Sequence, residues 1–164
     1  MHCTTRSVVT ALTAVLLTSA AAMVVSPIAS ADNNRLNQSV VANLYTTQHN
    51  AGCTNRVTVN PRLQLAARWH TNDVLNNHGL GADIGSDGST VADRARSAGY
   101  SGNVAETVGI NPALAISGIE LMNQWYSNPA YLAIMQDCAF TQIGVWSENS
   151  LDRTVVVAVY GVPR

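Results

Sequence analysis

GSDGSTVADRARSAGY, residues 85–100, combines a turn-rich loop with a short helix. Gly, Ser and Asp dominate its first half, and these residue types favour turns. The loop lacks the alternating acidic ligands of a calcium-binding loop, so it predicts a turn and no calcium site. Thr90 and Asp93 have the spacing of a capping box, in which both side chains satisfy N–H groups at the helix start. Gly99 is placed to end that helix.

The sequence before this stretch predicts two longer helices. In residues 60–79, Asn60 is a cap, Pro61 takes the first helical position and Gly79 ends the helix. The expected inner face of this helix consists of Leu63, Ala66 or Ala67, His70 and Val74. Residues 32–52 predict another helix that ends at Gly52, and its expected inner face consists of Leu36, Val40, Val41, Leu44 and Tyr45. The short β-branched segment 57–59 lies between them.

The sequence after this stretch predicts helices and then a hairpin. The pairs Asn111-Pro112 and Asn128-Pro129 each carry a helix start signal. The first of these helices is expected to point Leu114, Ile119, Met122 and Trp125 inward. Residues 141–147 and 154–162 are rich in β-branched residues and predict two strands joined by 148–153. The order, helices first and a late hairpin, indicates an α+β fold with helices packed on a small sheet.

Residues 1–31 predict a secretory signal peptide. An uncharged apolar run, 8–25, precedes the small-residue pattern Ala29-Ser30-Ala31. An uncleaved membrane anchor is the alternative, since the run is long enough to be considered; its many Thr, Ser and Ala residues favour cleavage. We therefore expect a signal peptide at 1–31 and a single domain at 32–164, secreted or associated with the cell surface, with no stable membrane span after cleavage.

Cysteine content and charge agree with export. Cys3 leaves with the signal peptide, and the even count that remains, Cys53 and Cys138, predicts one disulfide. Two separate free thiols are the alternative. The formal net charge is −1 and the pI is about 6.4, and no basic stripe is present. Nucleic acids and anionic membranes are therefore not expected as partners.

The candidate chemistry centres on Glu106, a lone carboxylate in the stretch NVAETVGI, residues 103–110. Burying it without a partner is costly, so it is either a structural carboxylate bonded to backbone amides or a hydroxyl, or a member of a cavity cluster. His70 has the same two interpretations, as a core histidine or a functional one. No H-E-x-x-H or G-x-S-x-G motif occurs. The sequence therefore predicts no metal, no cofactor and no identifiable catalytic residue.

Taken together, these segments resemble the CAP superfamily (the cysteine-rich secretory, antigen 5 and pathogenesis-related-1 type), in particular its bacterial secreted branch. The similarity covers residues 36–162 and is most specific in the loop and helix at 85–100. The other segments that carry it are NPRLQLAARWHTNDVLNN (60–77), AETVG (105–109), WYSNPAYLAIM (125–135) and CAFTQIGVW (138–146).

The resemblance implies an α-β-α sandwich with a Cys53–Cys138 disulfide. In this family a central cavity carries two histidines and two acidic residues, which bind a divalent metal in some members. Glu106 matches the first acidic residue, whereas Asp83 and Tyr131 stand where the family has its histidines. The second acidic residue has no counterpart. The resemblance thus implies a degenerate cavity lined by Asp83, Glu106 and Tyr131, with His70 on the neighbouring helix.

Three function classes follow from the resemblance. The favoured one is a non-catalytic extracellular domain that binds a lipid or small apolar ligand. An extracellular hydrolase or protease is the second class, but without the two cavity imidazoles no general base is evident. The third is a surface antigen or protein-interaction module, for which the sequence names no protein partner.

Overall fold

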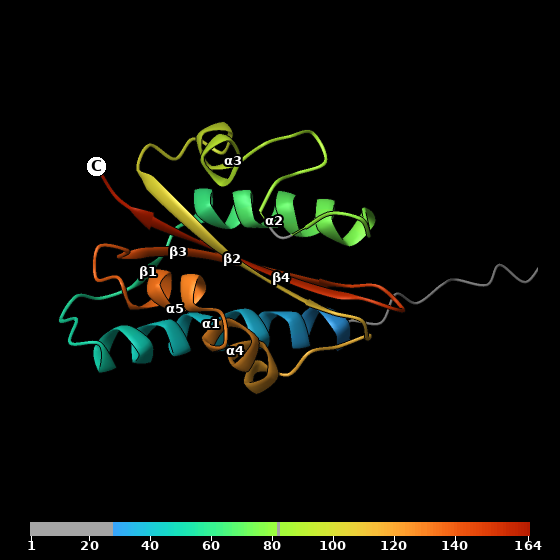
Figure 1. The fold of residues 1–164 in the computed structure, drawn as a ribbon, viewed down its shortest axis with the longest axis horizontal. Coiled ribbons are helices and arrows are strands. Elements are labelled where there is room, and N and C mark those ends of the chain that lie inside the picture. The colour runs from blue at the N-terminus through green and yellow to red at the C-terminus, as the bar shows by residue number, and fades with distance from the viewer. Residues whose placement is uncertain (1–27, 82) are drawn as a thin grey trace, which may run out of the picture.

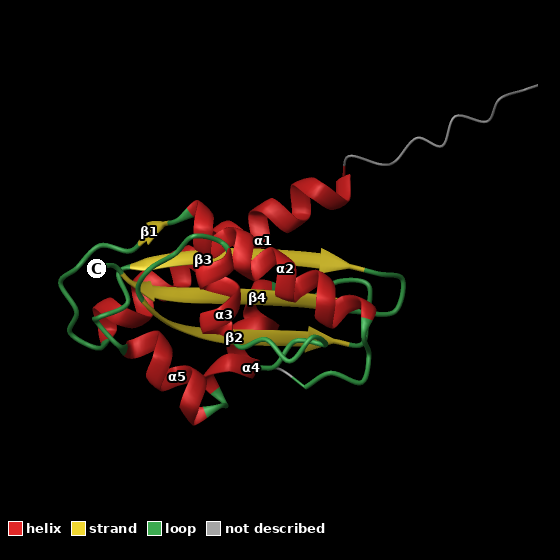
Figure 2. Ribbon diagram, turned by 90° about the horizontal axis from the view of Figure 1, so that it is seen from above, coloured by secondary structure: helices red, strands yellow, loops and turns green. Residues whose placement is uncertain are grey.

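The computed structural model describes residues 28–81 and 83–164, and it has three layers (Figure 1). A four-stranded sheet lies between two helical layers, with α2 and α3 on one face and α1, α4 and α5 on the other. Figure 2 shows the same sheet from above, beneath α2 and α3. The α+β class and the α-β-α sandwich are thereby confirmed.

The sheet is mixed, with one parallel and two antiparallel strand pairs. Its helices are α1 (Ile28–Asn50), α2 (Pro61–Asn76), α3 (Val91–Ser97), α4 (Gly118–Tyr126) and α5 (Pro129–Gln136). Its strands are β1 (Thr58–Val59), β2 (Asn103–Asn111), β3 (Gln142–Asn149) and β4 (Thr154–Val162). The strand order is β1-β3-β4-β2, with β1 parallel to β3 and the other pairs antiparallel. The long strand β2 therefore lies at one edge of the sheet.

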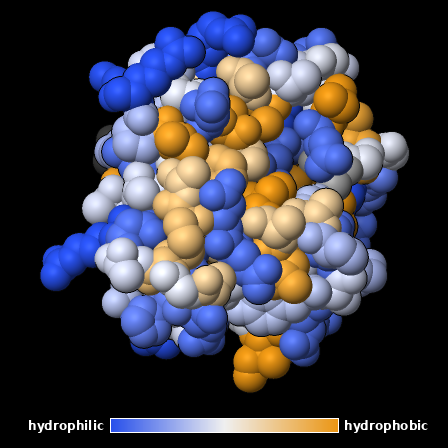
Figure 3. All heavy atoms as spheres, turned by 60° about the vertical axis from the view of Figure 1, so that its left-hand side comes forward, coloured by the Kyte–Doolittle hydropathy of each residue, from blue (hydrophilic) through white to orange (hydrophobic). Residues whose placement is uncertain are grey.

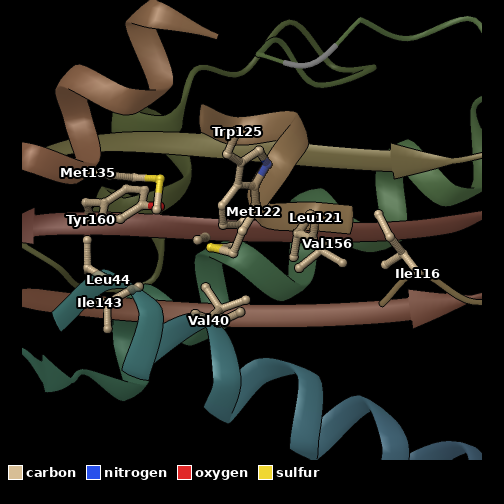
Figure 4. Close-up of a cluster of buried hydrophobic side chains, with 12 residues drawn as sticks. Val40, Leu44, Ile116, Leu121, Met122, Trp125, Met135, Ile143, Val156 and Tyr160 are labelled. Carbon is tan, nitrogen blue, oxygen red and sulfur yellow. The ribbon is translucent and has the colours of Figure 1, made fainter. Parts of the chain in front are cut away.

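Strand β4 holds the two layers together because both of its faces are buried. Val156, Ala158 and Tyr160 pack with α1, α4 and α5, in the cluster that Figure 4 shows. The alternate residues Val155, Val157 and Val159 pack with α2 and α3. This explains the continuous β-branched sequence of β4, since a strand covered on both faces has no need of a polar side.

Helix α2 lies very close to the sheet. A Cβ on Gly144 of β3 would come within 2.0 Å of the Gln64 backbone nitrogen. The inner face of α2 is fully buried as predicted, and it includes Leu63, Ala66, Ala67, His70 and Val74. Asn60 caps this helix as predicted, but the helix ends at Asn76 rather than at Gly79.

The loop and helix at 85–100 form as predicted. Thr90 and Asp93 make the reciprocal hydrogen bonds of a capping box, and Gly99 follows α3 with φ +84°. The turn is also tied to α2, because Asp73 accepts hydrogen bonds from the backbone N–H and the hydroxyl of Ser86, at 2.7 and 2.6 Å. Residues 86–90 of the loop are therefore attached to both α2 and α3.

The prediction of a helix opening at Asn111-Pro112 is wrong. Residues 103–111 form strand β2, which the sequence analysis did not predict, and Asn111 pairs with Thr154 at its end. The Asn111 side chain donates to the Ala115 carbonyl, which closes a turn. Helix α4 begins only after Ser117, whose hydroxyl accepts from the Glu120 N–H. Of the four side chains expected to point inward, Met122 and Trp125 are buried, whereas Leu114 and Ile119 are exposed.

Helix α1 buries Val40 and Leu44 as predicted, but Tyr45 is 49% exposed. The Cys53–Cys138 disulfide is confirmed and joins the segment after α1 to the segment after α5. The predicted signal peptide falls mostly outside the described residues, and α1 begins at Ile28, before the expected mature start at Asp32. Cleavage there stays a prediction. No helix among residues 28–81 and 83–164 is long and apolar enough to cross a membrane.

Candidate functional site: a buried glutamate held by an arginine

Glu106 lies in the middle of edge strand β2 and is only 6% exposed. Its direct partner on β4 is Val159, and directly paired residues of antiparallel strands lie on the same face of the sheet. Since Val159 packs with α2 and α3, the Glu106 carboxylate points into that layer. The strand that was not predicted is thus the element that positions the candidate residue.

Arg94 of α3 meets this carboxylate. Its Nη2 atom donates to Glu106 Oε1 at 2.5 Å, and both side chains are buried. The same guanidinium donates to the carbonyls of Ser89, at 2.7 Å, and Asp83, at 3.3 Å. Arg94 therefore binds one oxygen of the buried carboxylate and ties it to the backbone at Ser89 and Asp83.

Sequence reasoning missed Arg94, although a signal was present. Val91 and Ala95 of α3 and its C-cap residue Ala98 form an apolar stripe, and the 3.6-residue period places Arg94 beside this stripe. Arg96, two positions on, lies on the solvent side, with a side chain that is 75% exposed. An arginine on the inner stripe of a short helix needs a buried anion, and Glu106 supplies it.

His70 lies on the other side of the carboxylate. It is fully buried on α2, and its Nε2 atom is 3.9 Å from Glu106 Oε1. The position follows from the helical period of α2, which puts residue 70 on the same face as Leu63, Ala67 and Val74. The structure therefore brings two of the predicted candidates, His70 and Glu106, together.

The other two candidates, Asp83 and Tyr131, meet at the rim of the site. Tyr131 belongs to α5, in the opposite helical layer, and its hydroxyl donates to Asp83 Oδ1 over 3.5 Å. This contact passes around the open edge of β2. Burial and the neighbouring Asp83 carboxylate raise the pKa of Tyr131. Of the two carboxylates expected to line the cavity with Tyr131, its hydroxyl therefore binds the exposed Asp83.

Burial dominates the electrostatics of Glu106. It raises the pKa of the carboxyl group to about 7, Arg94 acts in the opposite direction, and Asp83 adds a further increase. The second carboxylate oxygen, Oε2, is buried and accepts no hydrogen bond from a described residue. A single guanidinium bond compensates only part of the cost of moving a carboxylate out of water.

The residues present do not fit the divalent metal that binds in some members of the CAP superfamily. Within residues 28–81 and 83–164, no three His, Cys, Asp or Glu side chains are placed to share a metal ion. The Oε1 atom of Glu106 already faces the positive charge of Arg94, which would repel a metal ion. A phenol and an exposed carboxylate, from Tyr131 and Asp83, are poor substitutes for two imidazoles.

The pKa of Glu106 predicts a pH-dependent stability. Because the folded-state pKa lies above the ordinary value of 4.5, the folded protein binds the Glu106 proton more tightly than the unfolded chain does. This contribution is complete below pH 4.5 and is lost as the pH rises through 7, and its upper limit is about 3 kcal/mol. Urea denaturation of wild type and Glu106→Gln between pH 4 and 8 measures this contribution as the difference between their free energies of unfolding. A difference that does not change with pH would contradict the assignment.

Comparison with known proteins agrees with this fold. The model of the cysteine-rich secretory protein family matches residues 28–160. A search of curated proteins found no match. An outer surface protein from Borrelia burgdorferi is similar in structure, with a TM-score of 0.67 and 13% identity over 79% of this chain and 94% of that protein.

A second similar structure is an extracellular protein containing an SCP domain from Bacillus anthracis. Its TM-score is 0.69 at 14% identity, and the match covers 85% of this chain but 44% of that protein. At these identities the structural similarity shows the fold alone. Together with the family model, which covers most of the sequence, it establishes that the chain belongs to the cysteine-rich secretory protein (CAP) family.

Proposed function

We propose that the protein is a secreted, non-catalytic CAP domain that carries a single-chain lipid or a similar small apolar ligand. The observation that supports a non-catalytic role is the bond between Arg94 and Glu106. A general base needs an accessible lone pair near the substrate. Glu106 is 6% exposed and its Oε1 atom binds a guanidinium, so a substrate has little access to this carboxylate.

A groove on the opposite helical layer supplies the binding site in this proposal. It runs between α1 and the start of α4, has a volume of about 480 Å³ and is largely open to solvent. The groove on the other flank of α1 has about 180 Å³. The residues that line the larger groove are Arg35, Leu36, Ser39, Asn43, Ile116, Ser117, Gly118 and Ile119.

The lining of this groove suits an amphipathic ligand. Ile119 and the half-buried Leu36 offer apolar surface for a hydrocarbon chain, whereas Ile116 is 7% exposed and adds little. Arg35 is exposed and lies at the α1 side of the groove, where it offers a positive charge to an anionic head group. The ligand that fits this combination is a single-chain carboxylic acid such as a fatty acid.

A fluorescent fatty acid tests the proposal in solution. We expect saturable binding to the wild type and at least a tenfold loss of affinity in Asn43→Phe, because the phenyl ring fills the groove. Arg35→Gln should weaken binding two- to fivefold, as expected for one exposed charge pair. Arg56→Gln removes an exposed arginine outside the groove and should leave the affinity unchanged, as a matched control. Equal losses of affinity in Arg35→Gln and Arg56→Gln would contradict the assignment of the groove as the binding site.

Two other experimental results would favour a different function for the protein. Hydrolysis of casein or an ester substrate by the wild type, abolished in Glu106→Gln, would indicate an enzyme. Absence of both hydrolysis and fatty-acid binding would favour the protein-interaction module, which the CAP fold also allows.

A further inference from the structure

Two large apolar side chains are exposed at the end of the sheet where β2 ends and β4 begins, and a third is exposed at the start of the helix that follows β2. Leu114 is 58% exposed in the β2–α4 connection, Ile119 is 78% exposed at the start of α4, and Leu151 is 93% exposed in the β3–β4 turn. A hydrogen bond of 2.8 Å from the Thr154 hydroxyl to the Ala113 carbonyl holds the connection against the base of the turn. Single exposed leucines are common, but clustered ones often indicate an interaction site. We call these three residues the apolar tip.

Helix α1 begins at the same end of the molecule. The Asn33 carbonyl accepts a hydrogen bond from Ser147, and Asn149 donates to the Asn33 side chain at 3.1 Å. In Figures 1 and 2 the start of α1 points toward the same end of the molecule as the β3–β4 turn. In the sequence, the apolar run 8–25 directly precedes this helix. The chain therefore enters the domain at the end that carries Leu114 and Leu151.

The apolar tip is continuous with the proposed ligand groove, since Ile119 belongs to both. We propose that the apolar tip docks the secreted domain onto a lipid surface with zwitterionic head groups, so that a ligand passes between the bilayer and the groove. This inference rests on the proposed lipid-carrier function. Leucine and isoleucine side chains gain free energy when they leave water for the acyl-chain boundary.

The charged residues at this end of the domain indicate which kind of lipid surface it can bind. Arg35, Glu120 and Asp152 are all exposed here, so both signs of charge are present. Anionic lipids attract clusters of Lys and Arg, which this end does not have among its described residues. Docking should therefore depend on apolar contact and change little with salt concentration. The charged residues beside the leucines also restrict the tip to shallow insertion.

Co-sedimentation with phosphatidylcholine vesicles tests the inference, using protein purified after export whose N-terminus has been determined. We expect the wild type to bind, and the double variant Leu114→Ser, Leu151→Ser to have at least a tenfold lower partition coefficient. Val59→Ser is the control, because Val59 on β1 is 54% exposed and lies at the far end of the molecule from the tip (Figure 1). Figure 3 shows that the side toward β1 also exposes apolar surface among hydrophilic residues. The Val59→Ser control thus tests whether any exposed apolar area is sufficient for vesicle binding.

The outcomes separate this inference from the proposed function. If the double variant loses vesicle binding but binds the soluble fluorescent fatty acid like the wild type, the docking surface is supported. No wild-type binding to phosphatidylcholine vesicles, or equal losses in Val59→Ser and the double variant, would overturn the docking surface and leave the groove intact. Binding only to anionic vesicles, abolished by salt, would also overturn it. Absence of fatty-acid binding by every form would instead overturn the carrier function.

Discussion

Replacing Arg94 with methionine is expected to destabilise the protein by about 3–5 kcal/mol at pH 8, because it leaves the Glu106 carboxylate buried without its partner. The loss should be smaller at pH 5. Burial raises the pKa of Glu106 to about 7 while Arg94 opposes the increase, so removing Arg94 raises this pKa further. At pH 5 the carboxyl group is then protonated in the variant, and no unpaired charge is buried.

Urea denaturation at the two pH values measures both effects. Arg96→Met is the matched control, since Arg96 lies on the same helix with a side chain that is 75% exposed, and such surface changes usually cost less than about 0.5 kcal/mol. If Arg94→Met cost no more than Arg96→Met, the ion pair would not stabilise the fold. A loss that is equal at pH 5 and pH 8 would show that Arg94 acts through its bonds to the Ser89 and Asp83 carbonyls rather than through its charge.

Removing the Cys53–Cys138 disulfide should cost about 4–5 kcal/mol. The bond spans 85 residues, and the loss of chain entropy in the unfolded state grows with the length of the closed loop. The double variant Cys53→Ser, Cys138→Ser avoids leaving a reactive thiol. Its free energy of unfolding, compared with that of the oxidised wild type, gives the contribution of the bond.

The reduced wild type is the control for the new side chains. It keeps both sulfur atoms, so reduced wild type and double variant should agree within about 1 kcal/mol. If the double variant were much less stable than the reduced protein, the loss would come from burying serine at Cys53, which is 5% exposed, and not from the missing cross-link. Full stability of the reduced protein would contradict the prediction.

The disulfide and the Arg94–Glu106 ion pair stabilise different parts of the fold. The disulfide fixes the segment after α1 to the segment after α5, beside the layer that carries the proposed ligand groove. The Arg94–Glu106 pair fixes the backbone at Asp83 and Ser89 to β2. The two links therefore stabilise the helical layers on opposite faces of the sheet.

Local sequence determined the elements whose signals lie within a few residues. The capping box of Thr90 and Asp93, the caps Asn60 and Asn128, and the hairpin were all predictable, because a cap or a turn depends on side chains that reach only their own backbone. The same holds for the buried face of α2, where the period of the helix alone places His70 inside.

Tertiary structure decided the elements whose stability comes from distant partners. Strand β2 contains a carboxylate and a glycine and gives a weak local signal, and it is a strand because all nine of its residues pair with β4. The misplaced helix start follows from the same cause, since Asn111 ends that pairing and the proline signal after it is overridden.

The partner of Glu106 was likewise decided by the tertiary structure. Sequence separates Glu106 from Arg94 by 12 positions and from His70 by 36, and no pattern states that α2, α3 and β2 meet at one point. They meet because β2 takes the edge beside β4, which turns Glu106 toward the α2 and α3 layer. The sequence by itself determined that a carboxylate was present in an apolar stretch and required a partner. Only the packing of the two helices on the sheet made that partner an arginine, since charge pairing in a buried site depends on spatial proximity and not on sequence spacing.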